Sequence, residues 1–581
     1  MLKSQVFCFV LLGVFGCLRE PVATQGVDLE WEWDQKIRTF SSCQELNSYV
    51  QRSKKAVPQQ VGLPLPVAAP QHYDNQTENV LEGDILQSNE SYFFLARQGS
   101  IEIIEKLSLE SVKSIPVALY HNQRLILTNE HLTFIGQNQD ATIVKVFELE
   151  DLKLSFEKIL DGAPVEIRVK DDQLIVVGQK YSPPTPEFGD CTKVYQPNLD
   201  DFTQGFTFVH ILNLKNARPV NSIGLAGRTD HLMVTNDEIL LFTNTPHSLG
   251  FFGGPKISSL PSHFRVIQWQ SGELTQSGLA VYSGIVKDRW AVSQSNGNLF
   301  LAASFYENGV SKFNNIQVFQ RGSLTYQSRS ESEKFGINED IRAVSYQAGK
   351  AYVVTFEKTD PLFVIDLTDV DHLRILAEVK APGFSTQLRP LKEGLWSGLG
   401  FQAHSQGGFS WLGGLQFSVF NLQDLASPFE SARLEWGARG SGSEATFESK
   451  ALYSTKSQDR VMFPVMLLKN AENSAPWEYS QVHEFSGAII LDIQKDQVNE
   501  AGRVSHREWR EKYCGQNHHL SRFWWNSLQV SADIRRIIQN EQGIYSFSHF
   551  GVMKTNPSTL QEESRLEFKN SNSLCSEYLS E

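Results

Sequence analysis

Hydrophobic and polar positions alternate in short runs of strand length along most of this chain, most clearly between residues 340 and 390. Residues 351–356 and 362–367 are apolar or β-branched runs, and Asp360-Pro361 separates them as a turn, because proline fixes its φ and cannot donate to a ladder. A third run at 375–379 follows another polar turn. The pattern predicts a small antiparallel sheet.

Weaker versions of this unit recur along the chain, and about nine candidate units can be counted at a spacing of roughly 45–70 residues. The long 3.6-residue periodicity that helical crossovers between parallel strands would need is absent. Radially arranged four-stranded sheets explain the count, because each unit alone is too small and stacking buries both of its faces. The sequence therefore predicts an all-β fold, a β-propeller of about eight blades, with seven to nine admitted because the two termini could share one blade. The apolar runs begin at residues 92, 123, 173, 238, 298, 350, 394, 460 and 543.

The N-terminus has the pattern of a targeting segment. Lys3 supplies a positive charge, and the apolar run at 6–14 is too short for an ordinary membrane span. The run ends in Val-Phe-Gly-Cys, which resembles the bacterial lipobox, and this predicts lipidation of Cys17 after removal of residues 1–16. Leu18 follows the cysteine, and in a host with two membranes this resembles the signal for outer-membrane sorting. The alternative is ordinary signal cleavage near this point, with Cys17 incidental.

The remaining chain divides by composition. Residues 17–38 are predicted to be a tether. Residues 39–78 combine a short helix at 40–49 with a Pro-rich linker, and Ser41 or Ser42 is expected to cap the helix with Glu45 in its first turn. Residues 79–568 carry the propeller signal, and 569–581 form a tail.

Charge and cysteine content narrow the function and the compartment. The net charge of -13 argues against non-specific binding to nucleic acid or to anionic lipid. If the chain is exported, the four cysteines beyond the leader and the lipobox predict two disulfides. Three pairings are open; we favour Cys514–Cys575, with Cys43–Cys191 as the other.

Three stretches together resemble a known family. They are residues 340–390 (especially YVVTF, DPLFVIDL and PGFST), GARGSGSEATFESKA at 437–451, and residues 533–553. They resemble bacterial and archaeal secreted proteins with a C-terminal β-propeller domain, distantly related to WD-repeat propellers. The resemblance covers about residues 79–568, although SQGGFSWLGG at 405–414 departs from it. It implies the fold, but no activity and no catalytic residue, because the family has no assigned function.

Motifs of known catalytic chemistry are absent: no G-x-S-x-G elbow, Walker loop, H-E-x-x-H or C-x-x-C occurs. Ser385 and Ser443 lack a nearby base and are interpreted as turn serines. The pair Asp340 and Arg342 recurs as Asp533 and Arg535 in a second D-I-R motif. We interpret these pairs, with Glu444, as structural; the alternative is a ring of charges around the central channel that binds a polar ligand or ion.

Metal and aromatic candidates remain. His506, Cys514, His518 and His519 have ligand chemistry without a matching second pair, so no metal site is predicted, and calcium at the acidic turn 366–369 is a weaker alternative. Aromatic residues in glycine-rich segments are candidates for protein or carbohydrate contact, unless the rings cap the blade ends. These aromatic residues are Phe251, Phe252, Phe409 and Trp411, and Trp524-Trp525 form a further pair.

The sequence thus favours an exported, lipid-anchored propeller that binds or scaffolds at the cell envelope as an outer-membrane or surface lipoprotein. Its partner would be an envelope protein or polysaccharide, its membrane attachment the lipid alone, and nucleic acid is not expected. One alternative is an envelope hydrolase or carbohydrate-binding protein that uses the central funnel, although an enzyme is the less favoured reading. Another is a subunit of an outer-membrane assembly machine, with an apolar patch built from Phe251, Phe252 and Trp411.

Overall fold

The computed structural model divides the chain into two units, Met1–Gln35 and Lys36–Glu581, and the first lies outside the described residues. In the second unit every β-strand that the structure describes belongs to one of nine sheets. The structure describes residues 37–56, 80–181, 190–196, 205–216, 221–235, 238–244, 262–270, 273–307, 310–356, 360–406, 409–472, 475–478, 482–514 and 534–568.

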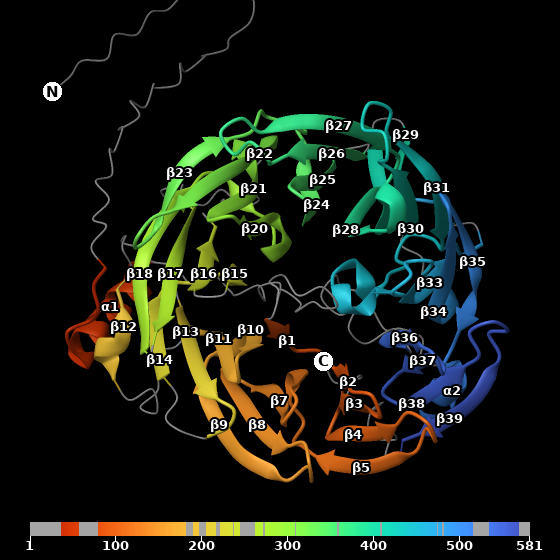
Figure 1. Ribbon diagram of the computed structural model, residues 1–581, viewed down its shortest axis with the longest axis horizontal. Helices are drawn as coiled ribbons and strands as arrows, with labels where there is room; N and C mark the ends of the chain where they lie inside the picture. Colours follow the sequence, from red (N-terminus) through yellow and green to blue (C-terminus); the bar gives the residue numbers. More distant parts are fainter. Residues whose placement is uncertain are drawn as a thin grey trace, which may run out of the picture. The chain divides into compact units, whose positions relative to one another are not determined.

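The nine sheets follow one another around a ring as the blades of a propeller (Figure 1). We number them blade 1 to blade 9 in chain order. In most blades four consecutive strands pair antiparallel, with the first strand nearest the ring axis and the last on the outside. This confirms the predicted fold. Nine blades lie within the predicted range, one more than the favoured eight.

Blade 1 contains β2 (Leu86–Ser88), β3 (Tyr92–Arg97), β4 (Ser100–Glu105) and β5 (Ser111–Pro116). Blade 2 contains β6 (His121–Leu127), β7 (His131–Asn138), β8 (Ala141–Glu148) and β9 (Leu154–Asp161). Blade 3 contains, in spatial order, β1 (Leu81–Glu82), β10 (Ala163–Lys170), β11 (Gln173–Lys180), β13 (Phe206–Asn213), β14 (Asn221–Ala226) and β12 (Val194–Tyr195). Blade 4 contains β15 (His231–Val234), β16 (Glu238–Thr243), β17 (Ser262–Gln270) and β18 (Glu273–Tyr282). Blade 5 contains β19 (Ile285–Val286), β20 (Val292–Ser295), β21 (Asn298–Glu307), β22 (Val310–Arg321) and β23 (Tyr326–Glu331). Blade 6 contains β24 (Asp340–Gln347), β25 (Lys350–Phe356), β26 (Asp360–Asp366) and β27 (Arg374–Ala381). Blade 7 contains β28 (Phe384–Pro390), β29 (Leu395–Gln406), β30 (Phe409–Asn421) and β31 (Phe429–Trp436). Blade 8 contains β32 (Tyr453–Ser454), β33 (Arg460–Lys469), β34 (Val482–Gln494) and β35 (Gln497–Val504). Blade 9 contains β36 (Arg536–Asn540), β37 (Gly543–Phe547), β38 (Gly551–Thr555) and β39 (Glu562–Glu567).

The hydrophobic core lies between neighbouring blades. Val354 and Val364 of blade 6 pack in one cluster with Leu388 and Trp396 of blade 7. Middle strands therefore meet a neighbour on both faces, which is why β33 and β37 are almost continuously buried. Outer strands such as β5 are largely exposed.

Packing between blade 9 and blade 1 closes the ring. Phe93 of β3 meets Tyr545 and Phe547 of β37 edge-on, with ring centroids 4.9 and 5.0 Å apart. Among the described strands, none of blade 9 pairs with a strand of blade 1, so no shared sheet joins these two blades. Closure by side chains rather than by a shared sheet explains why the count is nine and not eight.

The chain before β2 crosses three blades near the ring axis. β1 pairs antiparallel with β10 of blade 3, and Asp84 then forms an isolated bridge with Leu125 of blade 2 before β2 enters blade 1. Glu82 and Asp84 are thereby carried into the centre of the ring.

The expected N-terminal helix is present as α1 (Cys43–Ala56), and a second helix, α2 (Arg507–Cys514), precedes blade 9. The side chain of Ser42 accepts a hydrogen bond from the Glu45 N–H, and Glu45 accepts one from the Ser41 N–H, one residue before the position used in a capping box. A disulfide between Cys43 and Cys191 fastens α1 to blade 3. Among the described helices, none has the length and apolar content needed to span a bilayer.

Candidate functional site

The centre of the ring is occupied by the connection between β31 and β32, residues 437–452, which we call the central loop. It forms two short 3₁₀ helices, Glu444–Thr446 and Ser449–Ala451. The first is capped by the hydroxyl of Ser443, which accepts from the Ala445 N–H, and the second by the carboxylate of Glu448. Both helices are buried, so their side chains must find polar partners inside the protein.

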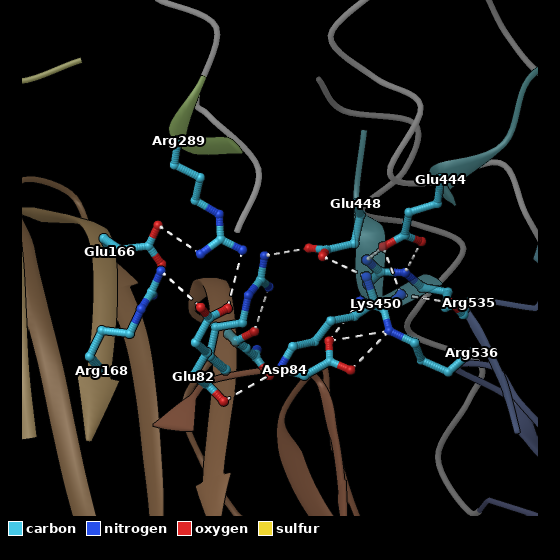
Figure 2. A network of polar contacts seen from close by, with 12 residues as sticks. Glu82, Asp84, Glu166, Arg168, Arg289, Glu444, Glu448, Lys450, Arg535 and Arg536 are labelled. Carbon is cyan, nitrogen blue, oxygen red and sulfur yellow. Dashed lines mark hydrogen bonds and ion pairs between the residues drawn. The ribbon is translucent and has the colours of Figure 1, made fainter. Parts of the chain in front are cut away.

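Glu444 of the central loop binds two arginines of blade 9 (Figure 2). Arg535 approaches its carboxylate with two hydrogen bonds, of 3.0 and 2.7 Å, and Arg536 contributes one of 3.0 Å. Arg536 also binds Asp84 at 2.7 Å, which joins the last blade to the first. The other acid of the loop, Glu448, lies 3.6 Å from Arg124 of β6.

The second half of the network surrounds Glu82. Its carboxylate lies 3.1 Å from Arg289 and 3.3 Å from Arg168, and both arginines also pair with Glu166 of β10. Lys450 of the central loop donates to the backbone carbonyl of Glu82 at 3.3 Å, which joins the two halves. We call the whole set the central network; its members are Glu82, Asp84, Arg124, Glu166, Arg168, Arg289, Glu444, Glu448, Lys450, Arg535 and Arg536.

Burial and neighbouring charges shift these groups in different directions. Burial opposes ionisation of Glu444, but Arg535 and Arg536 outweigh it and hold the pKa of that carboxyl at about 2. At Glu448 burial prevails over Arg536 and Arg124, and the pKa rises to about 8. Burial lowers the pKa of Lys450 well below its usual value. Two carboxyls four residues apart therefore hold different charges near neutral pH.

We expect Glu448→Gln to gain stability relative to the wild type as pH rises from 6 to 8. A raised folded-state pKa adds stability that is full below the unfolded value and is lost as pH rises through the folded one. The uncharged glutamine lacks this loss, so the difference should grow by about 1.4 kcal/mol per pH unit. Urea unfolding at several pH values measures it. Glu378→Gln, on the outer strand β27, is the control, and a constant difference for Glu448→Gln would contradict the assignment.

The charged groups of the central network are paired with one another and are largely buried. Nearly every carboxylate has a guanidinium partner, and the side chains of Glu82, Arg168, Glu444 and Arg536 are at most 4% exposed. Such groups orient strands and fix the positions of blades, whereas a substrate would reach them only if the central loop moved. The geometry therefore favours an architectural role for the network itself.

Of the D-I-R candidates, Asp340 and Arg342 lie on the inner strand β24, and Arg535 stands one residue before β36. Asp340 and Arg342 lie at the start of β24, with 3.7 Å between the carboxylate and Nη2. Arg535 instead binds Glu444, and Asp533 lies outside the described residues. Arg535 thus has a partner in the central loop, Glu444. The nearest acid to Arg342 is Asp340 of its own motif, at 3.7 Å.

The structure separates the aromatic candidates. Phe251, Phe252, Trp524 and Trp525 lie outside the described residues, and Phe409 is described only in its backbone, at the start of β30. Trp411 stands on β30 rather than in a flexible loop, and it is 9% exposed. Its ring packs against Trp477, which is 44% exposed, at 5.9 Å. Trp411 therefore adds little to an exposed apolar patch.

Other candidate residues have local roles. His506 is buried between Ser546 and Ser548, and Ser385 and Ser443 are buried as well. Asp366 accepts hydrogen bonds from Thr368 in its own turn, and no group of three or more His, Cys, Asp or Glu suited to a metal occurs within the described ranges. Whether calcium binds stays a prediction. Cys17, His518, His519 and Cys575 lie outside the described residues, as does the side chain of Cys514.

Most of the central network was not foreseen from the sequence. Only Glu444 and Arg535 were singled out. The alternation of Glu166 and Arg168 within an apolar strand was a usable signal, because charges inside a buried strand must be paired. Their partners lie far away in the sequence: Glu82 and Arg289 are 207 residues apart.

Comparison with known proteins agrees with the ring of blades. The family model described as "Beta propeller domain" matches residues 74–560. A protein of Methanocaldococcus jannaschii described as uncharacterized is 26% identical over 442 residues, and the match covers 61% of this chain and 68% of that protein. Another, of Archaeoglobus fulgidus, is 29% identical over 161 residues, 28% of this chain and 23% of that one.

Two solved structures are similar at a lower level. Hsv2 of Kluyveromyces marxianus is 12% identical, with a TM-score of 0.31, over 61% of this chain and 98% of its own. The dihydro-heme d1 dehydrogenase NirN is 12% identical, with a TM-score of 0.38, over 73% and 74%. Function has to be argued from the residues of this chain.

Proposed function

Because the chain belongs to the beta propeller domain family, whose fold holds connecting loops on a rigid frame, we propose that it is an exported, lipid-anchored binding or scaffolding module of the bacterial cell envelope. Its partner would be an envelope protein or polysaccharide. The burial and mutual pairing of the central network are the observations that support binding through loops rather than through the funnel. The central loop and the segment around Glu82 contribute the paired charges of this network.

The disulfide supports export. Cys43 and Cys191 are bonded across 148 residues, and such bonds persist mainly in oxidising compartments. The bond also holds α1, which follows the predicted tether, against blade 3. A lipid on Cys17 would thus be connected to the propeller through a fastened segment.

Lipidation predicts that Cys17→Ser moves the protein from the membrane fraction to the soluble fraction of its host. The matched control is Cys8→Ser, which changes a cysteine of the predicted leader and should leave the distribution unchanged. Mass spectrometry of the mature N-terminus should find the lipid in the wild type and in Cys8→Ser only. Identical distributions of Cys17→Ser and the wild type would overturn the anchor.

The partner is tested in the same extracts. After chemical cross-linking in cells and gentle detergent extraction, a scaffold should carry one envelope protein or polysaccharide in constant ratio. A protein that carries the lipid but no such partner would leave the anchor standing and remove the scaffold.

An envelope hydrolase or carbohydrate-binding protein is the second candidate. It is favoured by Glu444 and Glu448, because carboxyls whose pKa values are driven apart are typical of acid–base pairs. Their burial among arginines weighs against it. If the pair is catalytic, the wild type should release reducing ends from isolated envelope polysaccharide and Glu448→Gln should not; no release by the wild type removes this candidate.

A further inference from the structure

Arg342 and Arg535 occupy equivalent positions in blades 6 and 9. Ala343 pairs with Val354, and Arg536 pairs with Phe547, at matching places in the first hairpin of each blade. Arg342 directly precedes Ala343, and Arg535 directly precedes Arg536. The surroundings of the two arginines can therefore be compared position by position.

The two sites also receive equivalent neighbours. The central loop enters blade 8 and contacts the arginine of blade 9; the connection before β20 enters blade 5 and contacts the arginine of blade 6. In blade 9 the entering connection supplies the carboxylate of Glu444. In blade 6 it supplies Lys287, whose ammonium donates to the backbone carbonyl of Arg342.

The two arginines differ in how well they are paired. Arg535 is 16% exposed and holds Glu444 with two hydrogen bonds. Arg342 is 37% exposed, its nearest acid, Asp340, lies 3.7 Å away, and its Nε has no hydrogen-bond partner among the described residues. A guanidinium at 3.7 Å from a carboxylate is beyond hydrogen-bond range, so the fork of Arg342 retains donors for another oxygen.

The surroundings of Arg342 hold the guanidinium in place. Its Cζ lies 5.7 Å from the centroid of Phe356 and 5.6 Å from that of Phe384. Lys287 is 34% exposed and pairs with Asp288 at 3.6 Å, again beyond hydrogen-bond range. The ammonium of Lys287 thus contacts the backbone of Arg342, whose guanidinium packs against two aromatic rings.

We propose that Arg342 and Lys287 bind a carboxylate group supplied from outside the chain, in the place that Glu444 occupies at Arg535. The planar fork of arginine suits the two oxygens of a carboxylate, and the ammonium adds a second positive charge. This site does not depend on export or on lipidation. The carboxylate comes either from a small organic acid or from an acidic side chain of a polypeptide.

Calorimetric titration of the full chain with succinate and with a hexaglutamate peptide, at low ionic strength, tests the proposal. We expect binding of at least one probe, and Arg342→Gln should weaken it about 10- to 100-fold, the range for a hydrogen bond to a charged group. Asp340→Asn should strengthen it, because a competing negative charge is removed. Arg374→Gln, an exposed arginine on β27 of the same blade, should change nothing.

The two probes separate the sources of the carboxylate. Binding of hexaglutamate without succinate identifies a polypeptide, and binding of succinate identifies a small acid. No binding of either probe overturns the proposal, as does equal binding by Arg342→Gln. If Arg342→Gln fails to fold, Asp340→Asn decides alone: a gain in affinity cannot come from unfolding, and unchanged affinity contradicts the site.

Discussion

Arg536→Met is expected to destabilise the protein by about 3–5 kcal/mol, the cost of leaving buried charges without their partner. Arg536 is 1% exposed and binds both Asp84 and Glu444. Without it, Asp84 loses its hydrogen-bonded cation and keeps only the more remote charge of Arg124, and Glu444 keeps only Arg535. Because Asp84 precedes blade 1 and Arg536 begins blade 9, the same change weakens the closure of the ring.

Arg565→Met is the matched control for this prediction. Arg565 lies on β39 of the same blade, 39% exposed, and pairs with Glu562 and Glu508 at the surface. Exposed pairs contribute about 0–1 kcal/mol, so its loss should be small. Urea unfolding of both variants gives the comparison. Adding Asp84→Asn to Arg536→Met should recover part of the loss, and equal losses in the two single variants would contradict the closing role.

The sequence predicts the fold where burial is most uniform. The apolar runs at 173–177, 350–356 and 460–465 are the second strands of their blades, β11, β25 and β33, which meet a neighbouring blade on both faces. Exposed outer strands such as β5 and β9 give weaker signals. The number of blades could not be read directly, because it depends on how blades 1 and 9 meet rather than on any run within a strand.

The centre of the ring is where prediction from sequence failed. A charged residue inside a strand pattern indicates that a partner exists, but not which one. Lys450 donates to a carbonyl 368 residues away, and Arg536 binds an acid 452 residues away. Such pairs follow from the order of blades around the axis, so they become visible only when the ring is closed. The D-I-R repeat marked Arg535, which belongs to the central network, and Arg342, which lies outside the network and has spare donors.

His506→Gln is expected to change how stability depends on pH. Ser546 and Ser548 each lie 2.8 Å from one ring nitrogen of His506, so the neutral imidazole can form a hydrogen bond at both nitrogens. Burial, with a smaller effect of Arg565, lowers the pKa of the ring to about 3. The unfolded chain takes up this proton near pH 6.5, so the stabilising contribution is present above that pH and is lost as pH falls toward 3. The loss amounts to about 1.4 kcal/mol per pH unit.

The glutamine variant carries no such proton, so its difference from the wild type should close as pH falls. At pH 8 it should be less stable by about 1–3 kcal/mol, because buried hydrogen bonds are lost. Below about pH 5 the order should reverse, since the wild type by then has lost a comparable amount through protonation of its unfolded state. Urea unfolding between pH 4 and 8 measures the crossing. His121→Gln, at the exposed start of β6, should stay parallel to the wild type. A parallel course for His506→Gln would mean that this buried histidine does not make the propeller sensitive to acid.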